Sequence, residues 1–123
     1  MIYAVLTLTL PLPPNLANAR LHWRAKHRKR ADYLASLEML RITRQIPPAP
    51  PAPFRAVTLG SHLYVWSFLD DDNALARIKW AADFLTRAGY IVDDKRPHCR
   101  FTIPDQTVDR KAQRLVLTLT PHD

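Results

Sequence analysis

The sequence is poor in cysteine, glycine and long apolar runs, and each shortage excludes a class of protein. Cys99 is the only cysteine, so no internal disulfide and no zinc finger of the two-cysteine, two-histidine kind can form. The two glycines supply no glycine-rich phosphate loop. No apolar run approaches the roughly 18–20 residues that cross a bilayer, and residues 1–10 lack the basic region and cleavage site of a signal peptide. We therefore expect a cytoplasmic protein with no membrane partner and no organic cofactor.

Positive charge, in contrast, is in excess. The chain contains 18 Lys and Arg against 11 Asp and Glu, which gives a formal net charge of +7. A basic domain of this size often binds a polyanion, and nucleic acid is the leading candidate. With 47% hydrophobic and 24% charged residues, the 123 residues indicate one globular domain that spans 1–123.

Both kinds of charge are concentrated in short segments. One segment of eleven residues holds six of the basic side chains: Arg20, Arg24, Lys26, Arg28, Lys29 and Arg30. A second window holds six of the aspartates: Asp70, Asp71, Asp72, Asp83, Asp93 and Asp94. Because a basic protein that gathers its carboxylates in this way brings like charges together, we expect a cation at the acidic window.

Hydrophobic spacing predicts six elements, which are strands over 1–10, 54–68, 99–103 and 113–120 and helices over 25–43 and 73–88. The third element, 54–68, is a strand that can also turn as a hairpin near Gly60. Asp72 or Asn73 is expected to cap the second helix and Gly89 to end it. The Pro/Ala segment 47–53 is expected to be a solvated spacer. The order β-α-β-α-β-β predicts a single two-layer α+β (mixed α/β) domain with a mixed sheet and two main helices.

The acidic window offers oxygen ligands for a hard cation. Asp70 and Asp72 are two residues apart at a strand end, so they share one side if the strand geometry persists. Mg²⁺ usually takes one or two carboxylates together with water and substrate phosphate. The alternative is that Asp70 to Asp72 form a capping cluster on a solvated turn. Asp93 and Asp94 are likewise either a second acidic pair at the same site or an ordinary turn.

Lys79 is the candidate cation beside these carboxylates. At about 100° per residue, it shares a narrow helix face with Asp72, whereas Arg77 points away to the solvent side. It can bind a scissile phosphate or stabilise the leaving oxygen. It can also form a salt bridge with Asp83 one turn later, and the two roles are compatible.

Three motifs occur in a fixed order along the chain: Leu10-Pro11-Leu12-Pro13-Pro14 with Asn18-Ala19-Arg20-Leu21-His22-Trp23-Arg24, then Asp70-x-Asp72-Asn73, then Leu85-x-x-Ala88-Gly89-Tyr90-x-x-Asp93-Asp94. Together they resemble the signature of the RusA-type Holliday junction resolvases. The resemblance covers about Leu6 to Trp23 and Trp66 to Asp94. The C-terminal tail fits only by its strand pattern.

The resemblance implies a bacterial or phage enzyme of DNA recombination and repair. It would be a homodimeric, Mg²⁺-dependent endonuclease, with Mn²⁺ as a possible substitute, that makes paired nicks in four-way DNA junctions. Asp70, Asp72 and Asp94 would be the essential metal-binding carboxylates, with Asp93 beside them. The family commonly has a lysine three residues after the Asn, where this chain has Ala76, so we assign that catalytic role to Lys79.

In such a nuclease the basic segment would grip the phosphates of branched DNA. The residues expected to do so are Arg20, Trp23, Arg24, Lys26, Arg28, Lys29 and Arg30. Trp23 would stack on an opened base, although tryptophan is more often a core residue. Two alternatives remain: an inactive DNA-binding protein of the same fold, which Ala76 favours, and an unrelated basic interaction module whose aspartates only cap a helix.

Overall fold

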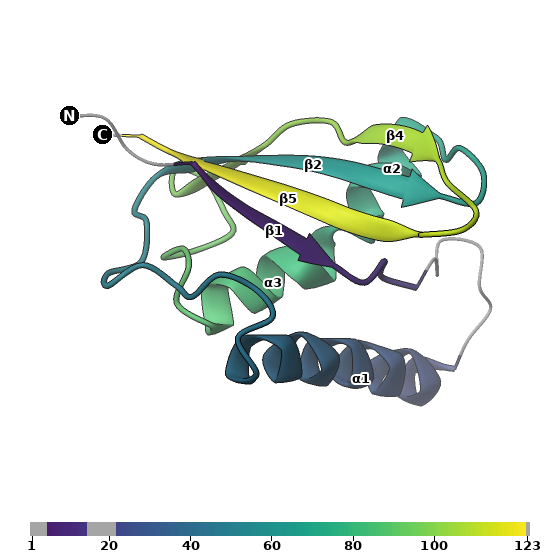
Figure 1. The fold of residues 1–123 in the computed structure, drawn as a ribbon, viewed down its shortest axis with the longest axis horizontal. Helices are drawn as coiled ribbons and strands as arrows, with labels where there is room; N and C mark the ends of the chain where they lie inside the picture. The colour runs from purple at the N-terminus through teal and green to yellow at the C-terminus, as the bar shows by residue number, and fades with distance from the viewer. Residues whose placement is uncertain (1–4, 15–21, 123) are drawn as a thin grey trace.

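A mixed five-stranded sheet carries all the helices on one of its faces in the computed structural model, which describes residues 5–14 and 22–122. The elements along the chain are β1 (Leu6–Leu10), α1 (Trp23–Ile42), β2 (Val57–Val65), α2 (Asp71–Arg77), α3 (Lys79–Arg87), β3 (Cys99–Phe101), β4 (Asp105–Val108) and β5 (Arg114–Pro121) (Figure 1). The predicted class, a single small α+β domain with a mixed sheet, is confirmed.

The sheet order is β1-β5-β2, with β3 and β4 following one another along the far edge of β2. Strand β5 runs antiparallel to both β1 and β2, whereas β3 and β4 run parallel to β2. The register places Leu8 opposite Leu117 and Leu63 opposite Leu115, so leucines from neighbouring strands project to the same face. This alternation gives the sheet one leucine-rich side.

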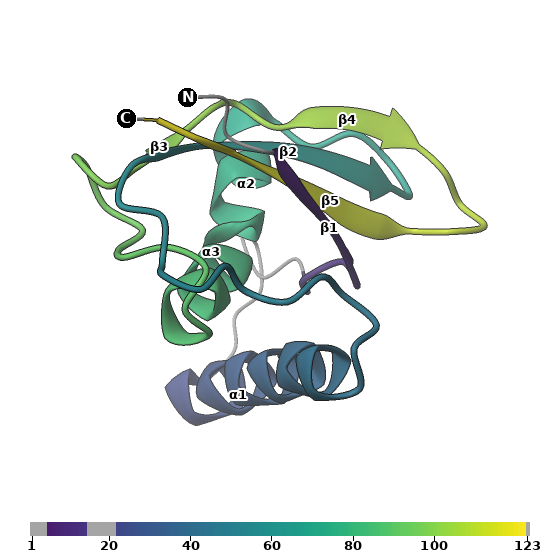
Figure 2. The same ribbon diagram turned by 60° about the vertical axis from the view of Figure 1, so that its left-hand side comes forward.

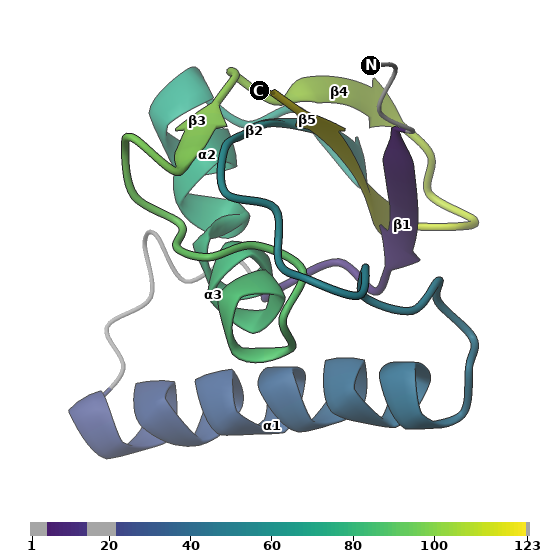
Figure 3. The same ribbon diagram turned by 90° about the vertical axis from the view of Figure 1, so that its left-hand side faces the viewer.

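The leucine-rich side is the core face. Strand residues Leu8, Leu59 and Leu117 are fully buried, as are Ile78 and Leu85 from the helical layer. Full burial of each such side chain contributes about 1.5–3 kcal/mol, which makes this contact between sheet and helices the main stabilising interface. The helices lie on this side of the sheet, and among the described residues no helix covers the other side (Figures 2 and 3).

Helix α1 packs beneath α3 rather than directly under most of the sheet (Figure 3). Its buried residues are Tyr33, Leu34 and Leu37. The Tyr33 hydroxyl donates to the carbonyl oxygen of Pro11 at 2.8 Å, so the helix is attached to the segment that follows β1. Burial raises the pKa of Tyr33, which keeps the hydroxyl protonated as a donor. In the described part of the chain, no helix is long and apolar enough to cross a membrane.

The hairpin considered at Gly60 is wrong. Strand β2 runs without interruption through Gly60, which pairs with Thr118 of β5. Inward-facing positions fall on every second residue from Val57 to Val65 with no change of phase, and a turn would have broken that alternation. A Cβ at Gly60 would lie 3.8 Å from the nearest neighbouring atom, an ordinary contact, so neither a turn nor a close backbone approach requires glycine here.

The long helix predicted over 73–88 is divided at Ile78. Helix α2 ends at Arg77 and α3 begins at Lys79. The Ile78 N–H bonds to the Leu75 carbonyl at 3.3 Å, three residues earlier, instead of to the carbonyl four residues earlier as in an α-helix. No proline or glycine lies at this break, and the side chain of Ile78 there is buried. The N-cap is Asp70, not Asp72 or Asn73, and its side chain makes no capping hydrogen bond.

The predicted end of the second helical segment is confirmed. Gly89 has φ of +84°, and the Tyr90 N–H returns to the Leu85 carbonyl at 2.9 Å. This left-handed position favours glycine because it has no Cβ.

Strand β4 was not predicted, because its sequence Asp-Gln-Thr-Val lacks apolar alternation and its strand form depends on pairing with β2.

Helix α1 ends in a comparable left-handed position, which Arg44 occupies with φ of +59°. The Gln45 N–H bonds to Leu40 at 2.9 Å and the Arg44 N–H to Arg41 at 3.2 Å, the pattern of a glycine-type helix end. We expect Arg44→Gly to raise the free energy of unfolding by about 0.5–1 kcal/mol, since relief of the left-handed strain exceeds the added chain entropy. Urea denaturation measures this. Gln45→Gly is the matched control and should lower stability; equal effects at both positions would contradict the strain.

Candidate functional site

The acidic turn, defined as Asp70 to Asp72, joins β2 to α2. All three side chains are exposed. Asp70 is the N-cap residue, and Asp71 and Asp72 form the first turn of the helix, where the partial positive charge of the helix N-terminus stabilises carboxylates. The Asp72 side chain accepts a hydrogen bond from the Asn73 N–H at 3.0 Å.

None of the three aspartates of the turn forms an ion pair within the described residues. The acids that do are Glu38 with Arg41, Asp83 with Arg30 and Arg87, and Asp109 with Arg114. In a protein of net charge +7, three adjacent carboxylates without a cationic partner repel one another, and a bound cation relieves that repulsion.

Gln106 of β4 holds the loop that carries the acidic turn. Its side-chain amide accepts from the Leu69 N–H and donates to the Leu69 carbonyl, both at 2.8 Å. Because Leu69 directly precedes Asp70, this two-point contact sets the position of the backbone at the start of the turn. Sequence reasoning missed Gln106 because it lies in a strand that was not predicted; no local pattern marks it.

The second acidic pair, Asp93 and Asp94, lies in the turn between α3 and β3. Hydrogen bonding lowers the pKa of Asp93; its largest contribution is the side-chain hydrogen bond shared with Asp94, and the backbone N–H groups of Lys95 and Asp94 act in the same direction. The pair also lies close enough to the buried Cys99 to act on its thiol. Burial, and then the charges of Asp94 and Asp93, raise the pKa of Cys99 to about 11, which makes the thiol unreactive at neutral pH.

The two acidic groups do not merge into one carboxylate cluster. Across residues 5–14 and 22–122, no group of three or more His, Cys, Asp or Glu side chains is placed to hold one metal ion. The joint site of Asp70, Asp72 and Asp94 therefore stays a prediction. The donor set of Asp70 and Asp72 by itself fits Mg²⁺, because this ion takes one or two carboxylates and keeps several waters.

Lys79 is exposed and is the first residue of α3. The ion pair considered with Asp83 does not form, because Asp83 instead contacts Arg30 and, at 3.5 Å, Arg87. Since the helix axis is interrupted at Ile78, the helical projection no longer determines how Lys79 faces Asp72. The assignment of Lys79 to the chemistry stays a prediction.

The expectation that Arg77 points to solvent is wrong. Its side chain is half-buried, and its Nε donates to the Pro13 carbonyl at 2.7 Å. Burial lowers the pKa of Arg77, and the nearby Tyr33 raises it in part. The proline-rich segment after β1 crosses this face of α2, a long-range contact that helix periodicity does not reveal.

The first turns of α1 form a basic surface, defined here as Trp23, Arg24, Lys26, Arg28 and Lys29, and all five are exposed. Trp23 is 64% exposed, so the core interpretation of this residue is wrong, and the Arg24 guanidinium lies 5.4 Å from the centre of its ring. Arg20, the remaining basic candidate before this helix, lies outside the described residues.

Arg30 differs from the basic surface because Asp83 binds its guanidinium. It lines a small pocket of about 210 Å³ between α1 and α3, together with Trp23, Lys26, His27 and Trp80. The pocket combines two indole rings with basic side chains, which suits a base or a phosphate at the edge of the basic surface. Arg30 contributes less net charge to DNA than the sequence predicts, since its charge is balanced by Asp83.

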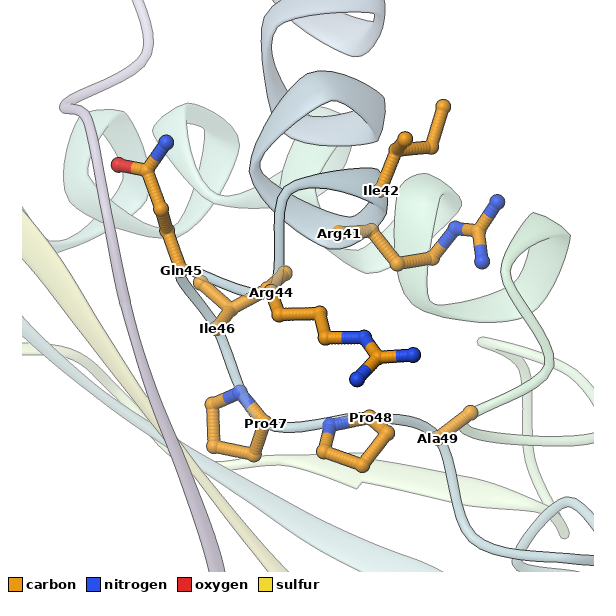
Figure 4. Close-up of a pocket in the computed structure, with 8 residues that line it drawn as sticks. All are labelled: Arg41, Ile42, Arg44, Gln45, Ile46, Pro47, Pro48 and Ala49. Carbon is orange, nitrogen blue, oxygen red and sulfur yellow. The ribbon is translucent and has the colours of Figure 1, made fainter.

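A larger open pocket of about 790 Å³ lies where α1 meets the Pro/Ala segment. In Figure 4 the guanidinium groups of Arg41 and Arg44 reach the same side of this pocket, above Pro47 and Pro48. Glu38 binds Arg41, and the Tyr90 hydroxyl donates to the Pro47 carbonyl at 2.5 Å. The pocket contains none of the residues predicted for catalysis, metal or DNA binding.

A scan against protein-family models finds no match to the chain, and a search of the curated proteins finds no similar sequence.

Proposed function

We propose that the chain is a metal-dependent, structure-specific DNA endonuclease of the RusA type, which resolves four-way junctions by paired nicks in DNA recombination and repair. The observation that supports this most is the acidic turn. Three adjacent carboxylates are exposed and without an ion-pair partner in the described chain of a strongly basic protein. Such an arrangement suits a hydrated Mg²⁺ that meets a phosphate.

Asp70 and Asp72 would hold the metal, with Mn²⁺ as a possible substitute for Mg²⁺. A bound Mg²⁺ supplies Lewis-acid stabilisation of the phosphodiester and lowers the pKa of water. Lys79 would donate to the scissile phosphate or to the leaving oxygen. The Gln106 amide would keep Asp70 at a constant position relative to β4.

The basic surface of α1 would bind the phosphates of the DNA arms. For each phosphate that is neutralised, the slope of the log binding constant against the log salt concentration becomes steeper by nearly one unit. Five exposed residues, four of them cationic, are available on the first two turns of α1. Binding and cleavage would therefore rest on different side chains.

A second candidate is a DNA-binding protein of the same fold without nuclease activity. The observation that favours it is Ala76, which occupies an exposed position of α2 where the family it resembles has a lysine. Incubation with a labelled four-way junction separates the two. Nicks that need Mg²⁺ and are absent in EDTA support the nuclease, and binding without nicks supports the second candidate. A linear duplex of the same sequence is the control, and neither binding nor cleavage of the junction would contradict both.

We also expect a homodimer. One chain supplies one acidic turn, whereas symmetric paired nicks require two, and two-fold symmetry is the commonest way to provide the second. Sedimentation velocity at micromolar concentration measures the mass in solution. A monomer that still nicks both strands would be incompatible with this expectation.

A further inference from the structure

The face of the sheet that no described helix covers carries a row of aromatic side chains. His62 and Tyr64 lie on β2, and Trp66 follows directly after the strand ends. Because alternate residues of a strand project to the same side, and Leu63 and Val65 are buried in the core, His62 and Tyr64 project to the helix-free side. Trp66 continues this spacing in the bend after the strand. The His62 and Tyr64 rings are stacked, with centres 4.4 Å apart and an interplanar angle of 16°.

Two arginines from the other end of the chain complete this row. The Arg114 guanidinium lies 3.7 Å from the centre of the Tyr64 ring and is held by Asp109 at 3.0 Å. The Arg110 guanidinium lies 4.7 Å from the centre of the Trp66 ring, and its Nε donates to the Trp66 carbonyl at 3.2 Å. The Tyr64 ring therefore has two ring partners in the described chain, His62 and Arg114, whereas the Trp66 ring has one, Arg110.

Trp66 is 57% exposed although it is a large apolar ring in a folded chain. Its one described ring partner is Arg110, whose charge stays available beside it, since no ion pair of Arg110 occurs within the described residues. Phe68, two residues on, is 68% exposed. An exposed indole backed by a free guanidinium is chemically suited to a nucleotide, because the ring stacks on the base and the cation meets the phosphate.

We propose that Trp66 and Arg110 form a stacking site for an unpaired base of a single nucleic acid strand, on the side of the sheet opposite to α1. The site accepts an unstacked base rather than a duplex, since a ring can stack only on a base that has left its own neighbours. His62, Tyr64 and Arg114 are positioning residues that support this end of β2. This inference deepens the proposed function, because it states that the nuclease would contact an unpaired strand. It rests on that function only in taking the nucleic acid to be DNA.

The stacking site lies close to the acidic turn along the chain. Trp66 and Asp70 are four residues apart, so their Cα atoms are separated by at most roughly 14 Å. Stacked nucleotides are spaced by about 3.4 Å, so a base held at Trp66 would place the strand within about four nucleotides of the carboxylates.

The test is binding of fluorescein-labelled oligo(dT) of 15 nucleotides in EDTA, followed by anisotropy. We expect Trp66→Ala to raise the dissociation constant by about 5- to 100-fold, Trp66→Phe to have a smaller effect, and Arg110→Ala to lower the salt slope by about 0.7. Met39→Ala, which removes an equally exposed apolar side chain from α1 (58% exposed), is the matched control and should bind as the wild type does. A variant with Trp23→Phe and Trp80→Phe leaves Trp66 as the sole indole, whose fluorescence should be quenched on binding.

The outcomes distinguish this site from the nuclease itself. Wild-type protein that cuts junctions but does not bind oligo(dT), or Trp66→Ala that binds as well as wild type, overturns the stacking site and leaves the nuclease standing. Weakened binding of Trp66→Ala supports the site even if no cleavage is ever observed. A change in sedimentation of Trp66→Ala without DNA would instead mark this face as a contact between two copies, and overturns the proposal.

Discussion

Asp72→Asn is expected to abolish cleavage of a four-way junction, while binding of the junction survives or becomes tighter. The substitution removes the negative charge that a hydrated Mg²⁺ requires. It also reduces repulsion of the DNA phosphates, which the basic surface of α1 binds independently. Because Asp72 is exposed and within the described chain accepts a hydrogen bond only from the adjacent Asn73 N–H, we expect thermal stability to change little. Gel shift in Ca²⁺ or EDTA and cleavage in Mg²⁺ measure the two functions separately.

Asp71→Asn is the matched control for this substitution. It removes the same charge from the neighbouring exposed position of the same helical turn. We expect it to retain most of the cleavage, because Asp71 has no assigned role at the metal. If Asp72→Asn lost binding and cleavage together in a folded protein, or if both substitutions had the same effect, the separate roles of metal site and basic surface would be wrong.

Lys79→Ala is expected to lower single-turnover cleavage by about 10²–10³-fold, since a cation at the developing charge typically stabilises the transition state by a few kcal/mol. Lys79 is exposed at the start of α3 and forms no ion pair in the described chain, so its loss should leave the melting temperature nearly unchanged. The assay uses saturating enzyme, so that weaker DNA binding does not appear as slower chemistry.

Arg77→Ala should lower the stability and leave the cleavage rate nearly unchanged, the opposite of what we expect for Lys79→Ala. The half-buried Arg77 guanidinium donates to Pro13, so truncation leaves a carbonyl of a buried residue without that donor and should cost about 1–3 kcal/mol of stability. Cleavage by the folded variant should remain close to that of the wild type. If Arg77→Ala slowed single-turnover cleavage more than Lys79→Ala did, Arg77 and not Lys79 would be the cation of the site.

The sequence by itself determined those elements whose signal is local. Alternation of leucines predicted β1 and β5, and it also identified which face of each strand is buried, because side chains on a strand alternate strictly. Helix α1 was predicted to within two residues at its start. Gly89 marked the end of α3, because glycine adopts the left-handed backbone conformation of this position without a steric penalty. The two-layer class followed from the order of these elements.

Tertiary structure alone decided how the elements meet at the candidate site. Strand β4 forms by pairing with β2, and its Gln106 reaches Leu69 across 37 positions of sequence. The contact of Arg77 with Pro13 likewise depends on a segment distant in the chain. Periodicity reports on one element at a time, whereas these features arise from side chains that different elements bring together. The lack of a joint ligand group among the described aspartates, and the exposure of Trp66 beside Arg110, belong to the same class.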